Sequence, residues 1–368
     1  MAFSEYRIFF DGQAADDVRV SMIDEIRVDL AIDMVAEAQI TIPIGRDEDG
    51  EWPDTLENEY EPLTRVRIEV SIDGADFVPL IEGRIVAQRF ELGGGPNESR
   101  AVLVVHDESA LMNREDKARA FEDMPPEDIA AQVFDEYGFS VDTQPSGIGA
   151  PSLERVVIQR GTDFSLLRRL ARQANMMLVI EPGSAPGETV GGFRHINLAG
   201  SDVPEMILSG AERNVNRLTL EFDALSPVKA RSDQVDHATL STLSAQSAEA
   251  ETDALGETRV SGLAHPAQIL IDPPAADTTA IQASVQSAVD RGAWAYSGDG
   301  EVSAEIYTGV LRPYQVLSVA GAGSRLSGSY LISEVTHTLR DDGYRQAFTL
   351  RRNARSDVSG PSIPGGIG

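Results

Sequence analysis

The chain of 368 residues contains no cysteine. This absence excludes disulfide bonds, thiolate metal sites and a cysteine nucleophile. The chain therefore has no thiol that could respond to the redox state of its compartment. The sequence also has no run of about 18 apolar residues, so we expect no transmembrane helix and no direct membrane insertion. Its N-terminal stretch, MAFSEYRIFF, lacks the basic region and the apolar core of a secretory signal.

Basic residues are scarce in this sequence. Its 31 Lys and Arg are outnumbered by 59 Asp and Glu, which gives a net charge of −28 at pH 7. Because such a surface repels phosphate, we expect no stable nucleic-acid binding. Two interpretations of the charge stay open: the acidic proteome of a salt-adapted host, or an acidic channel lining that keeps nucleic acid from adhering. The scattered positions of the acids favour the first interpretation.

Motifs for catalysis and for metal or nucleotide binding are also missing. The sequence has no GxSxG elbow, no P-loop and no HExxH motif. Gly93 to Gly95 precede Pro96 and no helix, which predicts a hairpin tip, and the acids are too numerous for a glycosidase pair to be identified. Five histidines lie too far apart for a helical metal pair: His106, His195, His237, His265 and His337. We therefore predict no enzyme activity, no cofactor, and no catalytic, cofactor-binding or metal-binding residue.

The stretch at residues 155–182 organises the rest of the chain. A short apolar run at 156–158 predicts a strand, and apolar residues from Phe164 to Ala174 recur at helical spacing. Thr162 or Asp163 can cap this helix, and Asn175 is a plausible end for it. An apolar strand follows at 176–180. On this stretch alone, an ordinary αβ element is the simplest interpretation.

Residues 1–105 read as short strands separated by turns, which predicts a barrel or a sandwich. Val18 and Val20 are included as alternating strand residues, and the acidic insert at 47–61 is expected to be a surface loop. The remaining expected strands lie at 6–10, 26–30, 39–44, 65–72, 78–81, 83–90 and 101–105.

Residues 106–195 favour a small subdomain. Pro125 and Pro126 suit the start of a helix that Gly138 ends. Loops rich in Pro, Gly and Ser are expected at 140–153 and 182–192, with a strand resuming at 195–198.

After this subdomain the pattern returns to strands, the first at 217–222. Residues 228–275 read as irregular, with a helix or a mobile loop at 241–257. A helix is expected at 277–295. Five strand candidates follow, and the last two form a hairpin with a turn at Asp342-Gly343: 302–306, 309–312, 314–319, 329–335 and 347–351.

Several motifs occur in an order that is similar to one known family. These motifs are "D-x-S-x-L" from Asp107, "EYGF" at 136–139, "QRGTDF" at 159–164, LRPYQVLSVAG from Leu311, and the closing hairpin at 327–354 that ends in Arg-Arg-Asn. Together they resemble the phage late control D and VgrG-like baseplate hub proteins of contractile tails and injection systems. Tyr314 stands where that family usually has Gly, which puts the geometry of this turn in doubt. The resemblance covers residues 80–354.

The resemblance implies a mainly β fold with an α+β subdomain: two tube-protein-like β-barrel domains plus a small inserted α/β domain. The first barrel would span 1–105, the α/β domain 106–195, and the second barrel 196–354 with an irregular insert near 228–275. Residues 355–368 would form a flexible Ser/Gly/Pro tail. His337 corresponds to the family's hairpin histidine, which we interpret as a packing or hydrogen-bonding residue.

The function implied by the resemblance is structural. Three copies would form a ring that joins the sixfold tail tube to the threefold spike around a central lumen. The expected partners are the tail tube protein, a separate spike protein and other baseplate components, with the tape measure protein as a further candidate. The expected place is the tail baseplate of a virion or injection particle, assembled in the bacterial host cytoplasm. The alternatives are a hydrolase or carbohydrate-binding β-protein of an acidic proteome, and a hub from a non-contractile tail.

Overall fold

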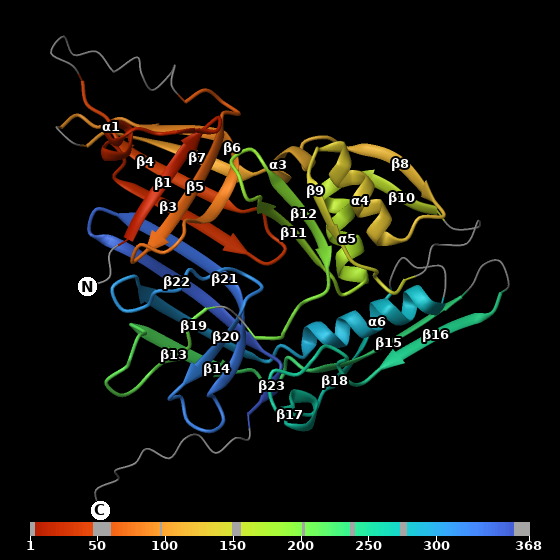
Figure 1. The fold of residues 1–368 in the computed structure, drawn as a ribbon. Coiled ribbons are helices and arrows are strands. Elements are labelled where there is room, and N and C mark those ends of the chain that lie inside the picture. Colours follow the sequence, from red (N-terminus) through yellow and green to blue (C-terminus); the bar gives the residue numbers. More distant parts are fainter. Residues whose placement is uncertain are drawn as a thin grey trace, which may run out of the picture.

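The computed structural model describes residues 4–46, 60–95, 98–148, 156–200, 203–235, 240–272 and 278–356. Strands hold the largest share of these residues, and a few helices lie beside the sheets (Figure 1). The predicted mainly β fold with a small α/β part is confirmed. Within the described ranges, no helix is both long and apolar enough to cross a membrane. Three predictions fall wholly or largely outside them: the loop at 47–61, His237 and the C-terminal tail. The hairpin tip predicted at Gly93 to Gly95 is confirmed, because these residues connect two antiparallel strands that pair as far as Glu91 and Arg100.

The N-terminal half of the fold, residues 4–107, is built from strands, some of which alternate between buried and less buried side chains while others are buried along most of their length. Its elements are β1 (Ser4–Phe10), β2 (Gln13–Ala14), α1 (Asp17–Ser21), β3 (Glu25–Ala31), β4 (Glu37–Pro43), β5 (Arg65–Ile72), β6 (Val78–Glu91) and β7 (Arg100–Asp107). The strand expected at Val18 and Val20 is wrong. This segment is the one-turn helix α1, because the Asp16 carboxylate caps it by accepting the Arg19 N–H at 2.9 Å. The two strands expected at 78–81 and 83–90 are the single strand β6.

The α/β region follows directly. Its elements are α3 (Ser109–Met112), β8 (Lys117–Glu122), α4 (Pro126–Glu136), β9 (Ser140–Thr143), β10 (Val156–Gly161), α5 (Asp163–Gln173), β11 (Met177–Pro182) and β12 (Thr189–Arg194). Both predicted helices are confirmed. The Thr162 hydroxyl caps α5 by accepting the Ser165 N–H at 3.2 Å, and Asn175 leaves the helix with φ +50°. The strands on either side of α5 belong to different sheets, because β10 pairs with β8 while β11 pairs with β12.

Two strands of the α/β region lie in segments that were expected to be loops: β9 within 140–153 and β12 largely within 182–192. The strand expected at 195–198 is wrong, and β12 occupies 189–194 instead. A Cβ added at Gly191 would lie 2.5 Å from the Phe134 ring of α4. Gly191 is therefore needed for close packing of this strand against the helix rather than for a turn.

The C-terminal half, residues 203–356, is the longest part. Its elements are β13 (Met206–Ile207), β14 (Arg217–Phe222), β15 (Val228–Val235), β16 (Thr242–Ser247), β17 (Thr258–Arg259), the 3-10 helix η1 (Val260–Gly262), β18 (Ala267–Leu270), α6 (Thr278–Gly292), β19 (Tyr296–Ser303), β20 (Val316–Ala320), β21 (Gly328–Arg340), β22 (Gly343–Arg352) and β23 (Ala354–Arg355). The predicted helix and the closing hairpin are confirmed. The strand expected at 309–312 is absent, because Leu311 and Gly309 bond to the Gln346 side chain instead.

The insert expected to be irregular is ordered over most of its described residues. β16, β15 and β18 form a three-stranded sheet, and α6 packs on it (Figure 1). The helix considered for 241–257 is wrong, since β16 lies within this range. Small buried residues such as Ala230 and Ala245 let Ile281 and Val285 of α6 lie close to the strands. Such short, polar and Ala-rich strands give little of the apolar alternation by which strands are recognised.

A single sheet of 13 strands runs through both halves in the order β14-β19-β22-β21-β3-β4-β7-β6-β5-β1-β2, with β20 and β13 attached beside β21. The largest cluster of buried apolar side chains lies mainly in the N-terminal half, a second in the α/β region and a third in the C-terminal half. These separate cores support the predicted division of the chain near 105 and 195, which stays a prediction.

Candidate functional site

The two β-halves meet on one strand, β21. Its first residues, Gly328–Leu331, pair with β20, and its later residues, Glu334–Arg340, pair with β3 of the N-terminal half. β22 occupies the opposite edge. The change of partner falls at Ser333, where the register with β22 shifts, and the Ser333 carbonyl accepts the Ile32 N–H at 3.0 Å. This bulge lets one strand serve both halves.

Tyr314 lies beside this bulge in a left-handed backbone conformation, with φ +69°. Its N–H donates to the Ile332 carbonyl at 2.9 Å, and its hydroxyl accepts the Asp33 N–H at 3.3 Å. Burial, and then the charge of Asp33, raise the pKa of Tyr314 above its ordinary value. The turn therefore keeps the conformation that a glycine would favour, and the tyrosine ring adds a contact to the N-terminal half.

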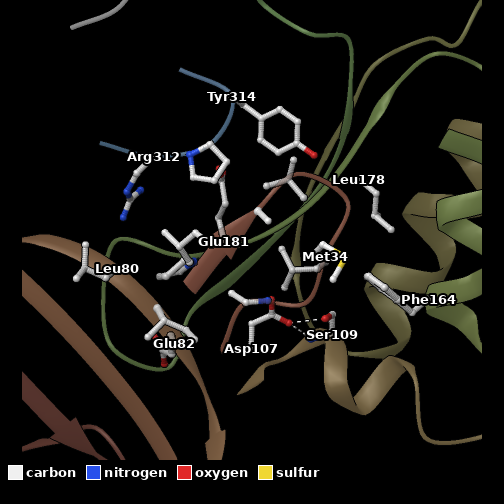
Figure 2. A pocket seen from close by; sticks show the side chains of 18 residues that line it. Met34, Leu80, Glu82, Asp107, Ser109, Phe164, Leu178, Glu181, Arg312 and Tyr314 are labelled. Atoms are coloured by element: carbon white, nitrogen blue, oxygen red, sulfur yellow. Dashed lines mark hydrogen bonds between the residues drawn. The ribbon is translucent and has the colours of Figure 1, made fainter. Parts of the chain in front are cut away.

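A cavity of about 80 Å³ lies beside Tyr314, where all three parts of the chain meet (Figure 2). Met34 comes from the N-terminal half, Phe164 and Leu178 come from the α/β region, and Arg312 precedes β20. Arg312 is unusual, because its Nε and Nη2 atoms are buried and have no hydrogen-bond partner among the described residues. Burial lowers the pKa of this guanidinium.

The "D-x-S-x-L" motif forms one wall of this cavity (Figure 2). The buried Asp107 carboxylate accepts the Ala36 N–H at 2.6 Å and the Ser109 N–H at 2.8 Å, and the Ser109 hydroxyl donates to it as well. Burial raises the pKa of Asp107 to about 6, although these hydrogen bonds oppose the shift. Asp107 thus connects the end of β7 to the residue that precedes β4.

A network of charged side chains continues this connection. Glu108, which is buried, pairs with Arg65 at 3.1 Å and with Arg84 at 3.2 Å. Arg67, also buried, pairs with Glu82 at 2.7 Å, and its Nη1 donates to the Ala185 carbonyl at 3.1 Å. Because the 183–188 hairpin belongs to the α/β region, these bonds attach that region to strands of the N-terminal half. The carboxylates here are held by arginines, which suits assembly rather than proton transfer.

The "QRGTDF" motif builds a second charged cluster inside the α/β region. The buried Asp163 carboxylate accepts from Lys117 and Arg119 at 2.5 Å each, from Tyr137 at 2.7 Å and from Gln159 at 2.8 Å. Burial alone would raise the pKa of Asp163, but the hydrogen bonds and cations outweigh it and hold the pKa below its usual value. The motif is therefore structural, because it joins α5 to β8 and α4.

The closing "R-R-N" motif anchors the end of the C-terminal half. The buried Arg352 donates from Nε to the Leu255 carbonyl at 3.1 Å and from Nη1 to the Ser327 carbonyl at 3.2 Å. Asn353 accepts the Leu255 N–H at 2.9 Å and donates to the Asp253 carbonyl at 2.7 Å. These two side chains hold the segment at 253–255 against the closing hairpin. The sequence showed the motif but not its partners, which lie about 100 residues earlier.

The histidines occupy separate places. His337 is buried in β21, and its Nδ1 lies 2.7 Å from the Tyr344 hydroxyl, as expected for a packing or hydrogen-bonding residue. Burial, and then the charge of Arg312, lower the pKa of His337 to about 3. His106 lies 3.1 Å from Glu37, and His195 lies 2.9 Å from the Pro145 carbonyl. Among the described residues, no three His, Cys, Asp or Glu side chains are grouped as a metal site.

Several solved structures share this fold. The 43 kDa tail protein of prophage MuSo2 from Shewanella oneidensis superposes with a TM-score of 0.67 at 14% identity, over 95% of this chain and 98% of that chain. The tail protein from Neisseria meningitidis MC58 gives 0.64 at 15% identity, over 95% and 97%. An Escherichia coli protein described as a component of the type VI secretion system gives 0.54 at 12% identity, over 94% and 75%. The fold is thus that of phage tail proteins and their relatives in secretion systems.

The sequence comparison identifies the family. No curated protein matches the sequence. A family model described as the phage tail baseplate hub (GPD) matches residues 67–343, which is most of the chain. The chain belongs to the phage tail baseplate hub family. The predicted family and the predicted function as a baseplate hub are confirmed at this level, and the family is a structural one.

Proposed function

We propose that three copies of this chain form the ring that joins a sixfold tail tube to a threefold spike. The observation that carries the proposal is the pair of β-halves within one continuous sheet. Seven strands, β3-β4-β7-β6-β5-β1-β2, belong to the N-terminal half, and six, β14-β19-β22-β21-β20-β13, to the C-terminal half. Three chains then present six β-halves to a sixfold tube, while the ring itself keeps the threefold symmetry of a spike.

The two ends of the long sheet supply the edges for such a ring. β14 has β19 on one side and no described strand on the other. β1 pairs along its whole length with β5, but on its other side β2 covers only Phe9 and Phe10. An edge strand with unpaired N–H and C=O groups pairs readily with another chain. In the proposed ring, β14 of one copy lies beside β1 of the next.

The proposed partners follow from this geometry. The tail tube protein stacks on the six β-halves, and a separate spike protein binds the threefold face. Other baseplate components and the tape measure protein contact the outside and the lumen of the ring. The particle is a contractile tail or an injection system, and the chain joins its baseplate in the host cytoplasm.

The first test is the mass of the purified chain in solution, measured by light scattering over a dilution series and again with the neighbouring spike protein. We expect three times the mass of one chain, either alone or once the spike is added. A chain that stays monomeric in both conditions contradicts the proposal.

A second test uses the absence of cysteine, which makes every introduced thiol unique. Glu5→Cys in β1 and Glu221→Cys in β14 place exposed thiols on the two sheet ends. In the double variant we expect oxidation to give covalent dimers and trimers on a denaturing gel. The matched control pairs Glu5→Cys with Asp135→Cys on the exposed surface of α4, and it should stay monomeric on the gel.

A further inference from the structure

One surface of this acidic chain is basic. A groove of about 440 Å³ lies between α5 and α6, where the C-terminal end of α5 meets α6 (Figure 1). Asp272 is the one carboxylate among its described lining residues, and it already accepts a hydrogen bond from Gln234 at 2.9 Å. Four arginines line the groove: Arg168, Arg169, Arg172 and Arg291. The groove is therefore basic, although the chain as a whole has a net charge of −28.

The two helices hold this groove in a fixed shape. The buried face of α5 includes Leu167 and Leu170, and the arginines lie on its other side. The Ser287 hydroxyl of α6 donates to the Arg172 carbonyl at 2.6 Å, and Arg291 donates to the same carbonyl at 3.1 Å. The end of α5 is thereby tied to α6. A ligand therefore meets a preformed surface and loses little binding energy to ordering it.

The arginines are only partly neutralised. Arg168 has no carboxylate partner among the described residues, and its guanidinium lies 5.9 Å from the Phe164 ring. Arg172 lies 3.6 Å from Asp33, which is a weak pairing. Arg169 donates to the Ile158 carbonyl at 3.2 Å.

Near the other wall, the buried Asp290 lies within electrostatic reach of Arg291 but bonds to Asn175 and to the Glu251 N–H. Burial lowers the pKa values of Arg169 and Arg291, which marks both cations as partly desolvated. Such cations attract carboxylates more strongly than fully hydrated ones do.

We infer that this groove binds the acidic segment 47–61 of a second copy of the chain, an inference that rests on the proposed ring. That segment contains eight Asp and Glu residues and no Lys or Arg. It leaves the N-terminal half next to the start of β7, because the Ile44 N–H donates to the Ser99 carbonyl at 3.0 Å. The α/β region begins at the opposite end of β7, roughly 25 Å away for a strand of this length. The groove of a neighbouring copy is therefore the natural acceptor.

The test measures binding of a fluorescent synthetic peptide of residues 46–61 to the full chain by anisotropy. We expect binding that weakens steeply with salt, because it depends on exposed charges. Arg168→Glu with Arg172→Glu should weaken it at least tenfold. Arg345→Glu with Arg351→Glu, an equal change of charge on the exposed side of β22, should leave it within about twofold.

Three outcomes contradict the inference: no binding of the peptide, equal loss with the β22 control pair, or a single-stranded DNA of equal charge that binds the groove more tightly than the peptide. The last outcome would assign the groove to nucleic acid.

A charge exchange in the full chain separates this inference from the proposed ring. The Arg168→Glu, Arg172→Glu chain should assemble less, as measured by light scattering. Adding Asp47→Lys and Glu48→Lys to the same chain should restore assembly. If the ring forms normally with the reversed groove, the inference fails and the proposed function stands. If the peptide binds the groove but no ring forms, the proposed function fails on its own.

Discussion

Asp163 in the α/β region and Asp107 at the junction are both buried carboxylates, yet their surroundings differ in kind. Asp163 accepts hydrogen bonds from two cations as well as from Tyr137 and Gln159, and its pKa is held below the usual value. Asp107 accepts only from neutral N–H and O–H groups, and burial raises its pKa to about 6. The two pKa shifts are therefore opposite in sign, and the bonded cations of Asp163 lower its pKa in a way that Asp107 lacks.

The difference also separates two structural roles. The Asp163 cluster is a closed unit in which each buried charge meets an opposite charge, so it holds one region rigidly. The junction around Asp107 and Arg312 contains buried polar groups that are less completely matched. Unmatched groups of this kind lower the stability of a packed interface.

The largest expected effect comes from removing the better-matched carboxylate. Asp163→Ala leaves Lys117 and Arg119 without their buried acceptor, and we expect a loss of about 3–5 kcal/mol in the free energy of unfolding. Denaturant titration at pH 7 measures this loss. Asp135→Ala, an exposed position on α4, is the matched control and should change the stability by less than about 0.5 kcal/mol. Similar values for the two variants would show that the Asp163 cluster adds no stability.

The pH dependence of stability should have opposite signs at the two sites. Because the folded pKa of Asp163 is lowered, the free energy of unfolding gains a contribution from its charged carboxylate. This contribution is present above the unfolded pKa and is lost as the pH falls through the folded pKa. Because the folded pKa of Asp107 is raised to about 6, the folded state holds this proton more tightly than the unfolded state does. The free energy of unfolding is therefore highest, as far as Asp107 is concerned, below the unfolded pKa, and it falls as the pH rises towards 6. The second loss amounts to about 3 kcal/mol at most.

Stability curves between pH 3 and pH 8 for Asp107→Asn and Asp163→Asn test these signs. We expect Asp107→Asn to remove the decline between roughly pH 4 and pH 6. Asp163→Asn should instead remove the decline at the acid end. Identical curves for the two variants would overturn the comparison.

Removing one hydroxyl group near each site, that of Ser109 or that of Thr162, should have a smaller effect on stability. Ser109→Ala removes one donor from Asp107, raises its pKa further and costs about 1 kcal/mol at pH 7. Thr162→Ala removes the cap of α5 and should cost a similar amount. Only the first variant should change the shape of the stability curve around pH 6, because only Ser109 bonds to the group that titrates there.

The smallest expected effect is that of Tyr314→Phe, which removes the hydroxyl that accepts the Asp33 N–H. We expect a loss of about 0.5–1 kcal/mol, measured by denaturant titration. Tyr314→Gly should cost more, despite the favourable backbone conformation, because it also removes the ring that lines the junction cavity. A glycine variant as stable as the parent would show that the ring does not join the halves.

Much of the fold could be predicted from local pattern. α5 and β5 have clear periodicity, and each begins within one or two residues of its predicted start. The segments that were misread have weak or conflicting local signals. Val18 and Val20 alternate as in a strand, but the Asp16 side chain caps a short helix there. Gly191 suggested a loop, but it lies in a strand where only a glycine leaves room for the Phe134 ring. In both cases a single contact outweighs the pattern.

The junction could not be predicted, because its contacts join residues far apart in the sequence. Asp107 bonds to Ala36, 71 positions away, and Tyr314 bonds to Asp33, 281 positions away. The sequence offered one signal here: a tyrosine at a turn that usually has glycine. That signal put the geometry of the turn in doubt, whereas Tyr314 keeps the left-handed conformation that a glycine would favour. The hydroxyl contact that accompanies it could be found only from the fold.

The shared strand β21 has a consequence for how the molecule unfolds. On one edge, the first residues of β21 pair with β20 and its later residues pair with β3. Neither half can therefore separate from the other without breaking backbone hydrogen bonds of β21. The two halves are therefore thermodynamically coupled, and heat should melt them in a single cooperative transition rather than one after the other. A mechanical load on one half is therefore shared by the other half and is not concentrated in a linker.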